Sequence, residues 1–126
     1  MKRISLAERT ATTSRAWIPY PVAEIDDHVA YVALYKDGAQ ALYASGNKFH
    51  AHEGDQLLVV LDGTVTFEDR AGVRITASKG DAVLVPRGEF HRASSPGGAH
   101  VLHVQSKAVT TAFKEEFDRG PEIVAG

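Results

Sequence analysis

The chain has 126 residues and a mass of 13.6 kDa, which fits a single compact domain. Its 14 basic and 16 acidic side chains give a net charge of -2. They are scattered along the sequence, so no basic patch that could bind nucleic acid is predicted. The absence of cysteine excludes disulfides, cysteine nucleophiles and thiolate ligands, and leaves nitrogen and oxygen atoms as ligands for any transition metal. Charges interrupt the N-terminus, and no window approaches the roughly 18 consecutive apolar residues of a membrane helix. We therefore expect a cytoplasmic protein with neither a nucleic-acid partner nor a membrane partner.

The first 29 residues are expected to form an N-terminal extension that packs on the main domain. Ser5 and Glu8 have the spacing of a capping box, in which a hydroxyl and a carboxylate three residues later satisfy the first backbone N–H groups of a helix. This spacing predicts a helical turn or two around residues 6–11. Pro19 and Pro21 then fix an extended path, so the helix cannot continue through them.

The main domain, residues 30–106, is predicted to be a series of short strands. Runs rich in Val, Leu and Tyr alternate with turns that contain Gly, Asp or Pro. The predicted strands cover residues 29–35, 41–44, 49–52, 56–61, 65–68, 73–77, 82–85 and 100–105. Asp62-Gly63, which separates two of them, is a strong hairpin signal. Many short strands with almost no helix predict an all-β sandwich or barrel.

Two apolar segments of the sequence need a partner surface. The run Leu57–Leu61 is hydrophobic on both faces, so one face should line the interior and the other needs cover from a second sheet, the N-terminal segment or another subunit. A second subunit would supply this cover, and we expect a homodimer. Val109, Phe113 and Phe117 lie four residues apart, the stripe of a short amphipathic helix. We therefore expect residues 107–126 to form a C-terminal helix and a tail.

Histidines supply the chemistry that the sequence suggests. His50 and His52 are two residues apart on a predicted strand, so both imidazoles project from the same face. Gln56 begins the next predicted strand after a short turn, and its side chain could return alongside them. Nothing local brings His91 near these residues, because only a closed barrel would do so. Each residue alone has an ordinary alternative, a hydrogen-bonded histidine or a solvated glutamine.

Two spacings in the sequence resemble the motifs of the cupin superfamily, in its small single-domain bacterial form. The first motif comprises His50, His52, Gln56 and Gly63, and the second comprises Gly80, Pro86, Gly88 and His91. The resemblance covers residues 30–105 and implies a double-stranded β-helix, or jelly-roll, barrel. The sequence departs from the family pattern in lacking its first glycine at the expected distance before His50. It also has Ser95 where the closing asparagine of the second motif would stand.

The resemblance also implies a metal site inside the barrel. In the family, three motif histidines and a glutamate bind one divalent metal. The corresponding residues are His50, His52 and His91, with Gln56 at the glutamate position. Such a ligand set suits Zn, Ni, Fe, Mn or Co without choosing among them. Because Gln56 supplies a neutral amide oxygen, the charge of the ion stays uncompensated, which strengthens it as a Lewis acid and favours non-redox chemistry.

Three functions remain open on the sequence alone. The first is a metal-dependent enzyme that activates a small polar metabolite, such as a sugar acid, keto acid or enol, by Lewis-acid chemistry. The second is a non-haem iron dioxygenase. The third is a non-catalytic barrel that binds or senses a small molecule. Cupins that act on unsaturated uronic acids also use a glutamine ligand, and His103 could occupy the place of their catalytic aspartate as a base. His103 faces the interior only if Val101 and Gln105 do, and a surface histidine is the alternative.

Overall fold

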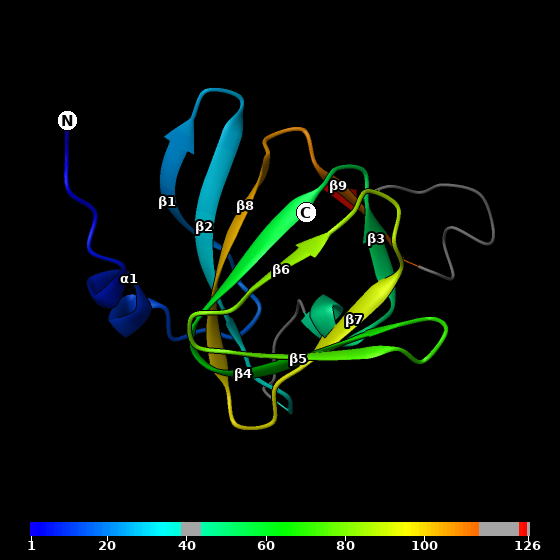
Figure 1. Cartoon of the computed structure of the whole chain (residues 1–126). Helices are drawn as coiled ribbons and strands as arrows, with labels where there is room; N and C mark the ends of the chain where they lie inside the picture. Colours follow the sequence, from blue (N-terminus) through cyan, green and yellow to red (C-terminus); the bar gives the residue numbers. More distant parts are fainter. Residues whose placement is uncertain (39–43, 114–123, 126) are drawn as a thin grey trace.

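Figure 1 shows the computed structural model, which describes residues 1–38, 44–113 and 124–125. A short helix, α1 (Leu6–Thr12), begins after Ser5, whose Oγ accepts a hydrogen bond from the Glu8 amide at 3.2 Å, as the capping-box spacing predicts. Of the strand predicted over residues 41–44, the last residue belongs instead to a 3-10 helix, η1 (Ala44–Asn47). Residues 41–43 lie outside the described residues. No helix in the described segments is long and apolar enough to cross a membrane.

The remaining elements are strands, and every pairing between them is antiparallel. They are β1 (Tyr20–Ile25), β2 (His28–Tyr35), β3 (His50–His52), β4 (Gln56–Asp69), β5 (Arg74–Ser78), β6 (Ala82–Val85), β7 (His91–Ser94), β8 (Ala99–Ser106), β9 (Thr110–Phe113) and β10 (Val124–Ala125). The hydrogen-bonded order is β1-β2-β8-β4-β7-β3-β9-β10, with β5 and β6 each paired to β4. β1 and β7 lie where the sequence predicted no strand.

The long strand β4 belongs to two layers. Its first half pairs with β8 and β6, and its second half pairs with β5 and β7. One layer therefore contains β1, β2, β8 and β6, and the other contains β5, β7, β3, β9 and β10, with β4 passing from one to the other (Figure 1). This two-layered antiparallel arrangement is that of a jelly roll. No ladder among the described residues closes the two ends of the sheet.

The hairpin predicted at Asp62-Gly63 is wrong, because β4 continues through these residues. The ladder between β4 and β8 shifts register between Val60 and Asp62, so the dipeptide marks the bend at which β4 changes layer. Gly63 has a φ of 72°, and a Cβ at this position would collide with the carbonyl oxygen of Gly98. A glycine is needed at this position, but the reason is the close approach of the neighbouring strand β8 and not a hairpin turn.

The C-terminal helix predicted over 109–117 is also wrong within the described residues, because Thr110–Phe113 is β9. Residues 114–117 lie outside the described residues. β9 pairs with β3, where Thr111 is the partner of His52. Without β9, one edge of β3 would present unpaired backbone N–H and C=O groups, and a strand satisfies them where a helix cannot. Val109 is buried as predicted, but it packs next to Gly54 just before the strand.

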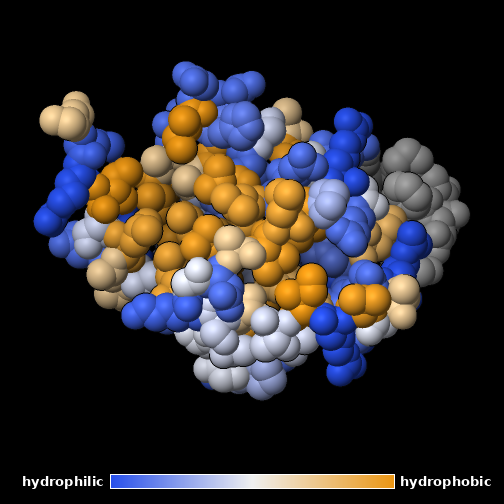
Figure 2. Space-filling model, in the orientation of Figure 1, coloured by the Kyte–Doolittle hydropathy of each residue, from blue (hydrophilic) through white to orange (hydrophobic). Residues whose placement is uncertain are grey.

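The core fills the space between the two layers. Its most deeply buried side chains are contributed by both halves of β4 and by β8: Leu58, Val60, Val65 and Val101. On the opposite, outer face, Leu57 of β4 and Leu84 of β6 are direct partners and remain 40% and 63% exposed. Figure 2 shows a broad hydrophobic area on this face, over β2, β8, β4 and β6. We call the pair Leu57 and Leu84 the outer apolar patch.

Candidate metal centre

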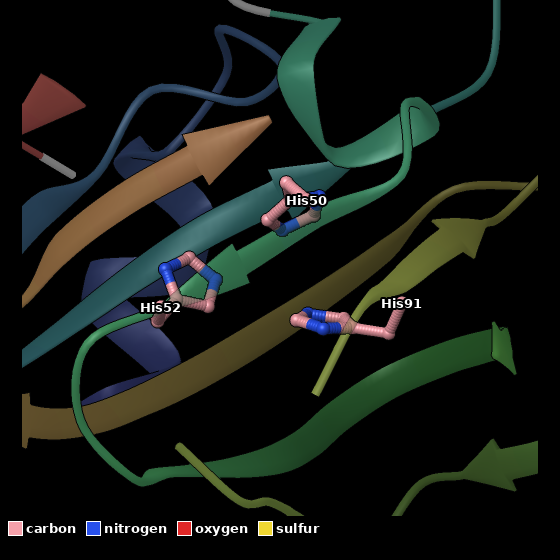
Figure 3. Close-up of side chains that lie close together, drawn as sticks. All are labelled: His50, His52 and His91. Carbon is pink, nitrogen blue, oxygen red and sulfur yellow. The ribbon is translucent and has the colours of Figure 1, made fainter. Parts of the chain in front are cut away.

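The structure brings His50, His52 and His91 together, and we call them the triad. His50 and His52 project from β3, and His91 is the direct partner of His50 on β7. The atoms that each could offer to a metal all lie within 4.8 Å of one another. Figure 3 shows the three imidazoles gathered around a common space. All three are buried, with exposed fractions of 7%, 9% and 6%. They therefore have the side-chain type and the convergence that a transition-metal site needs.

A hydrogen bond fixes the ring of each triad histidine through Nδ1. His50 Nδ1 donates to the carbonyl oxygen of Lys48 at 2.7 Å, and His91 Nδ1 donates to that of Glu89 at 2.9 Å. His52 Nδ1 lies 2.9 Å from the hydroxyl of Thr111. A carbonyl oxygen only accepts, so neutral His50 and His91 carry the proton on Nδ1 and the lone pair on Nε2. His52 has the same form when its Nδ1 donates to the hydroxyl. This is the arrangement by which proteins orient histidine ligands from outside the coordination sphere.

Burial keeps the triad neutral. It lowers the pKa of His50 to about 4, and repulsion from His91 adds to this effect. It lowers the pKa of His52 to about 2, with further repulsion from the other imidazoles, and it lowers the pKa of His91 as well. Neutral imidazole is the form that binds a metal, so the triad needs no deprotonation at neutral pH. The donor set thus fits a divalent transition metal.

Gln56 is buried at the start of β4, with 3% of its side chain exposed. Only three residues separate it from His52. Its Nε2 donates to Oε1 of Gln105, its direct partner on β8, at 2.5 Å. The same Oε1 accepts a hydrogen bond from the hydroxyl of Tyr31 on β2 at 3.0 Å. The amide of Gln56 is therefore held by a buried polar network.

His103 faces the interior from β8, the orientation that alternation alone left open. Its ring stacks on Tyr31 with 4.6 Å between ring centroids, and its Nε2 lies 2.7 Å from the hydroxyl of Tyr35. Burial lowers the pKa of His103 to about 3 and raises that of Tyr35 well above its usual value. Tyr35 therefore keeps its proton, and the direction of the bond depends on the tautomer of His103: with the hydroxyl donating to Nε2 the ring proton is on Nδ1, and with Nε2–H donating to the hydroxyl oxygen Nδ1 carries the lone pair. Nδ1 is buried and has no hydrogen-bond partner.

No carboxylate is buried among the described residues. The buried polar side chains are neutral hydroxyls, amides and imidazoles: Thr13, His50, His52, Gln56, His91, Ser95, His103, Gln105 and Thr111. Among the described residues, therefore, no buried side chain would offset the charge of a bound cation. Ser95, at the position of the closing asparagine, lies outside the site and donates to the carbonyl oxygen of Thr64 at 2.7 Å.

Sequence reasoning missed the supporting roles of Thr111 and Tyr31. Thr111 was hidden because its segment was predicted as a helix. Tyr31 shares the inward face of β2 with Tyr35, but alternation does not reveal which polar atom a tyrosine meets.

Comparisons with known proteins agree with this architecture. Residues 43–105, half of the chain, match the model of the Cupin_2 family, the cupin domain. An acireductone dioxygenase from Tuber melanosporum (strain Mel28) is 35% identical over 63 residues, which are 47% of this chain and 34% of that protein. The chain thus spans only about a third of this relative's length.

Two solved structures have the same fold. A cupin-2 domain containing protein from Shewanella frigidimarina NCIMB 400 superposes with a TM-score of 0.70 at 19% identity, over 82% of this chain and 93% of that one. Hydroquinone 1,2-dioxygenase from Sphingomonas sp. TTNP3, solved with 4-hydroxybenzoate bound, gives a TM-score of 0.60 at 15% identity, over 77% and 70% of the two chains. These likenesses confirm the predicted all-β jelly-roll fold.

Proposed function

Because the chain belongs to the cupin domain family, as the match over residues 43–105 establishes, we propose that it is a metal-dependent enzyme acting on a small polar metabolite. The metal is one divalent transition ion, with His50, His52, His91 and Gln56 as its protein ligands. The observation that carries the proposal is the triad: three buried, neutral imidazoles that converge while their Nδ1 atoms are occupied. The substrate is a molecule such as a sugar acid, keto acid or enol.

The neutral interior supports this substrate class. When bound, the ion would supply Lewis-acid activation of an oxygen on the substrate. The triad and Gln56 bring no negative charge, and no carboxylate is buried elsewhere in the described residues. An anionic oxygen is therefore the ligand that best neutralises the site. The stacked and tilted rings of the half-buried Tyr31 and the buried Tyr35 and His103 would supply an apolar wall with polar atoms, which is typical of small-molecule pockets.

We assign His103 a catalytic role as part of this proposal. The sequence suggested a base, and we propose instead a hydrogen-bond donor: the tautomer in which the Tyr35 hydroxyl donates to Nε2 has its ring proton on the unpartnered Nδ1. A buried donor without a partner costs about 1–3 kcal/mol. A substrate oxygen that accepted from Nδ1 would recover this energy only in the complex.

Two relatives favour a second candidate, a non-haem iron dioxygenase. The curated relative is named acireductone dioxygenase, and one solved structure is hydroquinone 1,2-dioxygenase. The two candidates differ in what they consume. A dioxygenase takes up dioxygen with substrate and Fe(II) and is inactive with Zn(II), whereas Lewis-acid chemistry proceeds under argon with Zn(II) or Ni(II).

We also propose that the protein is a homodimer. Leu57 and Leu84, the outer apolar patch, are exposed partners on β4 and β6, and Figure 2 shows a broad hydrophobic area over these strands. A second copy of the chain could cover this face.

The first experiment is elemental analysis of protein purified without added metal, followed by titration with Zn(II), Ni(II) and Fe(II). His52→Ala should abolish stoichiometric binding. His28→Ala should leave it intact, because the His28 side chain is 52% exposed and contacts Asp27, away from the triad. Turnover of keto acids, sugar acids and enols is then measured on each metal form. Binding of a metabolite with no product under any metal would show a non-catalytic binding barrel and would refute the enzyme proposal.

A further inference from the structure

We propose that the outer face of the layer that contains β5 and β7 carries a small-molecule site of its own, which binds a hydroxylated anion such as a sugar acid or a sugar phosphate. The site is a hollow of about 380 Å³ formed by the second half of β4, β5, β7, η1 and the turn after β7 (Figure 1). We call it the outer hollow. Its polar lining residues are Asn47, Thr66, Glu68, Arg74, Arg92 and Ser94.

The register of three strands builds the floor of the outer hollow. Glu68 on β4 is the direct partner of Arg74 on β5 and of Arg92 on β7. Two residues earlier on β4, Thr66 is the direct partner of Ser94 on β7. Because alternate residues of a strand share a face, these side chains form two adjacent polar rows on the outer surface, while the buried residues between them face the core.

Two guanidinium groups give the outer hollow its positive charge. Arg74 Nε donates to Glu68 Oε2 at 2.7 Å, and Arg92 donates to Glu68 Oε1 through Nε at 2.9 Å and Nη2 at 2.6 Å. These hydrogen bonds lower the pKa of Glu68, so it stays ionised and holds both groups. Arg92 also lies over the ring of Phe49, 4.6 Å from its centroid. Two cations and one carboxylate leave one net positive charge, which favours an anionic ligand.

The guanidinium groups keep donors for such a ligand. In the described part of the chain, both terminal nitrogens of Arg74 and Nη1 of Arg92 have no hydrogen-bond acceptor. The two side chains are 68% and 45% exposed, so a dissolved molecule reaches them. A carboxylate or phosphate group can accept from planar guanidinium groups through two oxygens at once.

Asn47 and Ser94 supply acceptors to the same hollow. Both N–H groups of Asn47 Nδ2 are used, because Nδ2 donates to Asp37 Oδ1 at 2.9 Å and to the carbonyl oxygen of Ala93 at 2.9 Å. Ser94 Oγ donates its one proton to Asp37 Oδ2 at 2.6 Å. Asp37 therefore leaves both residues with oxygen lone pairs and no proton to donate. The hydroxyl groups of a ligand, which can donate, complement them.

Donors and acceptors thus share one small volume. A molecule with an anionic group and several hydroxyl groups matches both kinds of lining. The volume of the outer hollow lies within the range of about 300–1,000 Å³ that is typical of small-molecule sites. Glu68 and Asp37 hold the lining side chains in place before a ligand arrives, so less side-chain freedom is lost on binding.

The outer hollow is separate from the triad. Arg92 directly follows His91 on β7, but alternation sends the two side chains to opposite faces, with His91 buried and Arg92 exposed. A ligand in the outer hollow therefore does not touch the metal ligands. The inference goes beyond the proposed function and does not depend on metal binding.

The test uses metal-free protein, so that no ligand binds through a metal, at an ionic strength of about 0.15 M. Gluconate and glucose 6-phosphate are titrated while the backbone amide NMR signals are followed. We expect saturable shifts that are largest on β5 and β7. Arg74→Gln should weaken the binding of both molecules about tenfold, because it removes charge-assisted hydrogen bonds. Arg9→Gln, an exposed arginine on α1, is the matched control and should have no effect.

Ser94→Ala tests the acceptors. It should weaken the binding of gluconate and glucose 6-phosphate more than that of inorganic phosphate, which lacks the hydroxylated chain. Tighter binding of gluconate would assign the site to sugar acids, and tighter binding of glucose 6-phosphate would assign it to sugar phosphates. Thermal unfolding of each variant shows whether the fold is retained.

Three results would overturn the inference. The first is a set of shifts that do not saturate or that lie away from β5 and β7. The second is an equal loss in Arg9→Gln and Arg74→Gln, which would show attraction by overall charge alone. The third is binding of neutral glucose as tight as that of gluconate, because the guanidinium groups would then play no part.

Discussion

Replacing Thr111 by valine should weaken metal binding without altering the ligands. Valine keeps the size of the side chain but removes the hydroxyl that lies 2.9 Å from His52 Nδ1. In the metal-free protein, His52 can compensate by turning its ring or moving its proton. In the metal-bound protein, Nε2 is committed to the ion, so Nδ1–H stays buried without an acceptor at about 1–3 kcal/mol. The penalty therefore falls mainly on the bound state, and we expect about tenfold weaker Zn(II) binding.

Isothermal titration with Zn(II) in the presence of a competing chelator measures this change. Thr111→Ser keeps a hydroxyl and should restore most of the affinity. Thr76→Val is the matched control, because Thr76 is an exposed strand residue whose hydroxyl contacts that of Thr66. Unchanged affinity in Thr111→Val would refute the reasoning. A comparable loss in Thr76→Val would do the same.

Three other predictions concern the fold. The interior histidines (the triad and His103) have lowered pKa values, whereas unfolded histidines titrate near 6.5. The unfolded chain therefore binds more protons below this pH, and the metal-free protein should lose up to about 1.4 kcal/mol of stability per histidine for each pH unit below 6.5. Urea unfolding at pH 7.5, 6.5 and 5.5 tests this, and a flat profile would contradict neutral interior imidazoles. Gly63→Ala should cost more stability than Gly72→Ala, since both have positive φ but only Gly63 would meet neighbouring backbone, and equal losses would argue against that collision. Leu84→Glu should convert the proposed dimer to monomers in sedimentation analysis. Val73→Glu should not, because Val73 is an exposed apolar residue away from the patch. A monomeric unmodified chain would refute the dimer proposal.

Local sequence patterns predicted much of the fold, because they reflect hydrogen bonds and side-chain directions that are set by residues close together in the sequence. Alternation located β2 and β8, and turn residues located the ends of β6. The capping spacing at Ser5 and Glu8 predicted the start of α1, because that hydrogen bond is made within one turn. The motif spacing named all three histidines of the triad before any geometry was known.

The failures involve contacts between distant segments. Asp62-Gly63 has the composition of a hairpin, but its conformation is decided by β8, which runs beside β4 on both sides of the bend. The stripe that begins at Val109 fits a helix, but the open edge of β3 recruits Thr110–Phe113 as a strand. Neither partner is visible from the segment itself. The second error also concealed Thr111, because a residue placed on a helix could not be expected to support His52.

The same reasoning explains why the candidate ligand set was easier to predict than the residues that orient it. A ligand set is restricted in residue type, since few side chains bind transition metals, and this protein has no cysteine to widen the choice. The orienting partners are backbone carbonyls for His50 and His91, which any residue could supply, and a hydroxyl for His52. Gln56 differs because its amide has two unlike ends, and its Nε2 donates to Gln105, a contact across the β4–β8 ladder that motif spacing does not reveal.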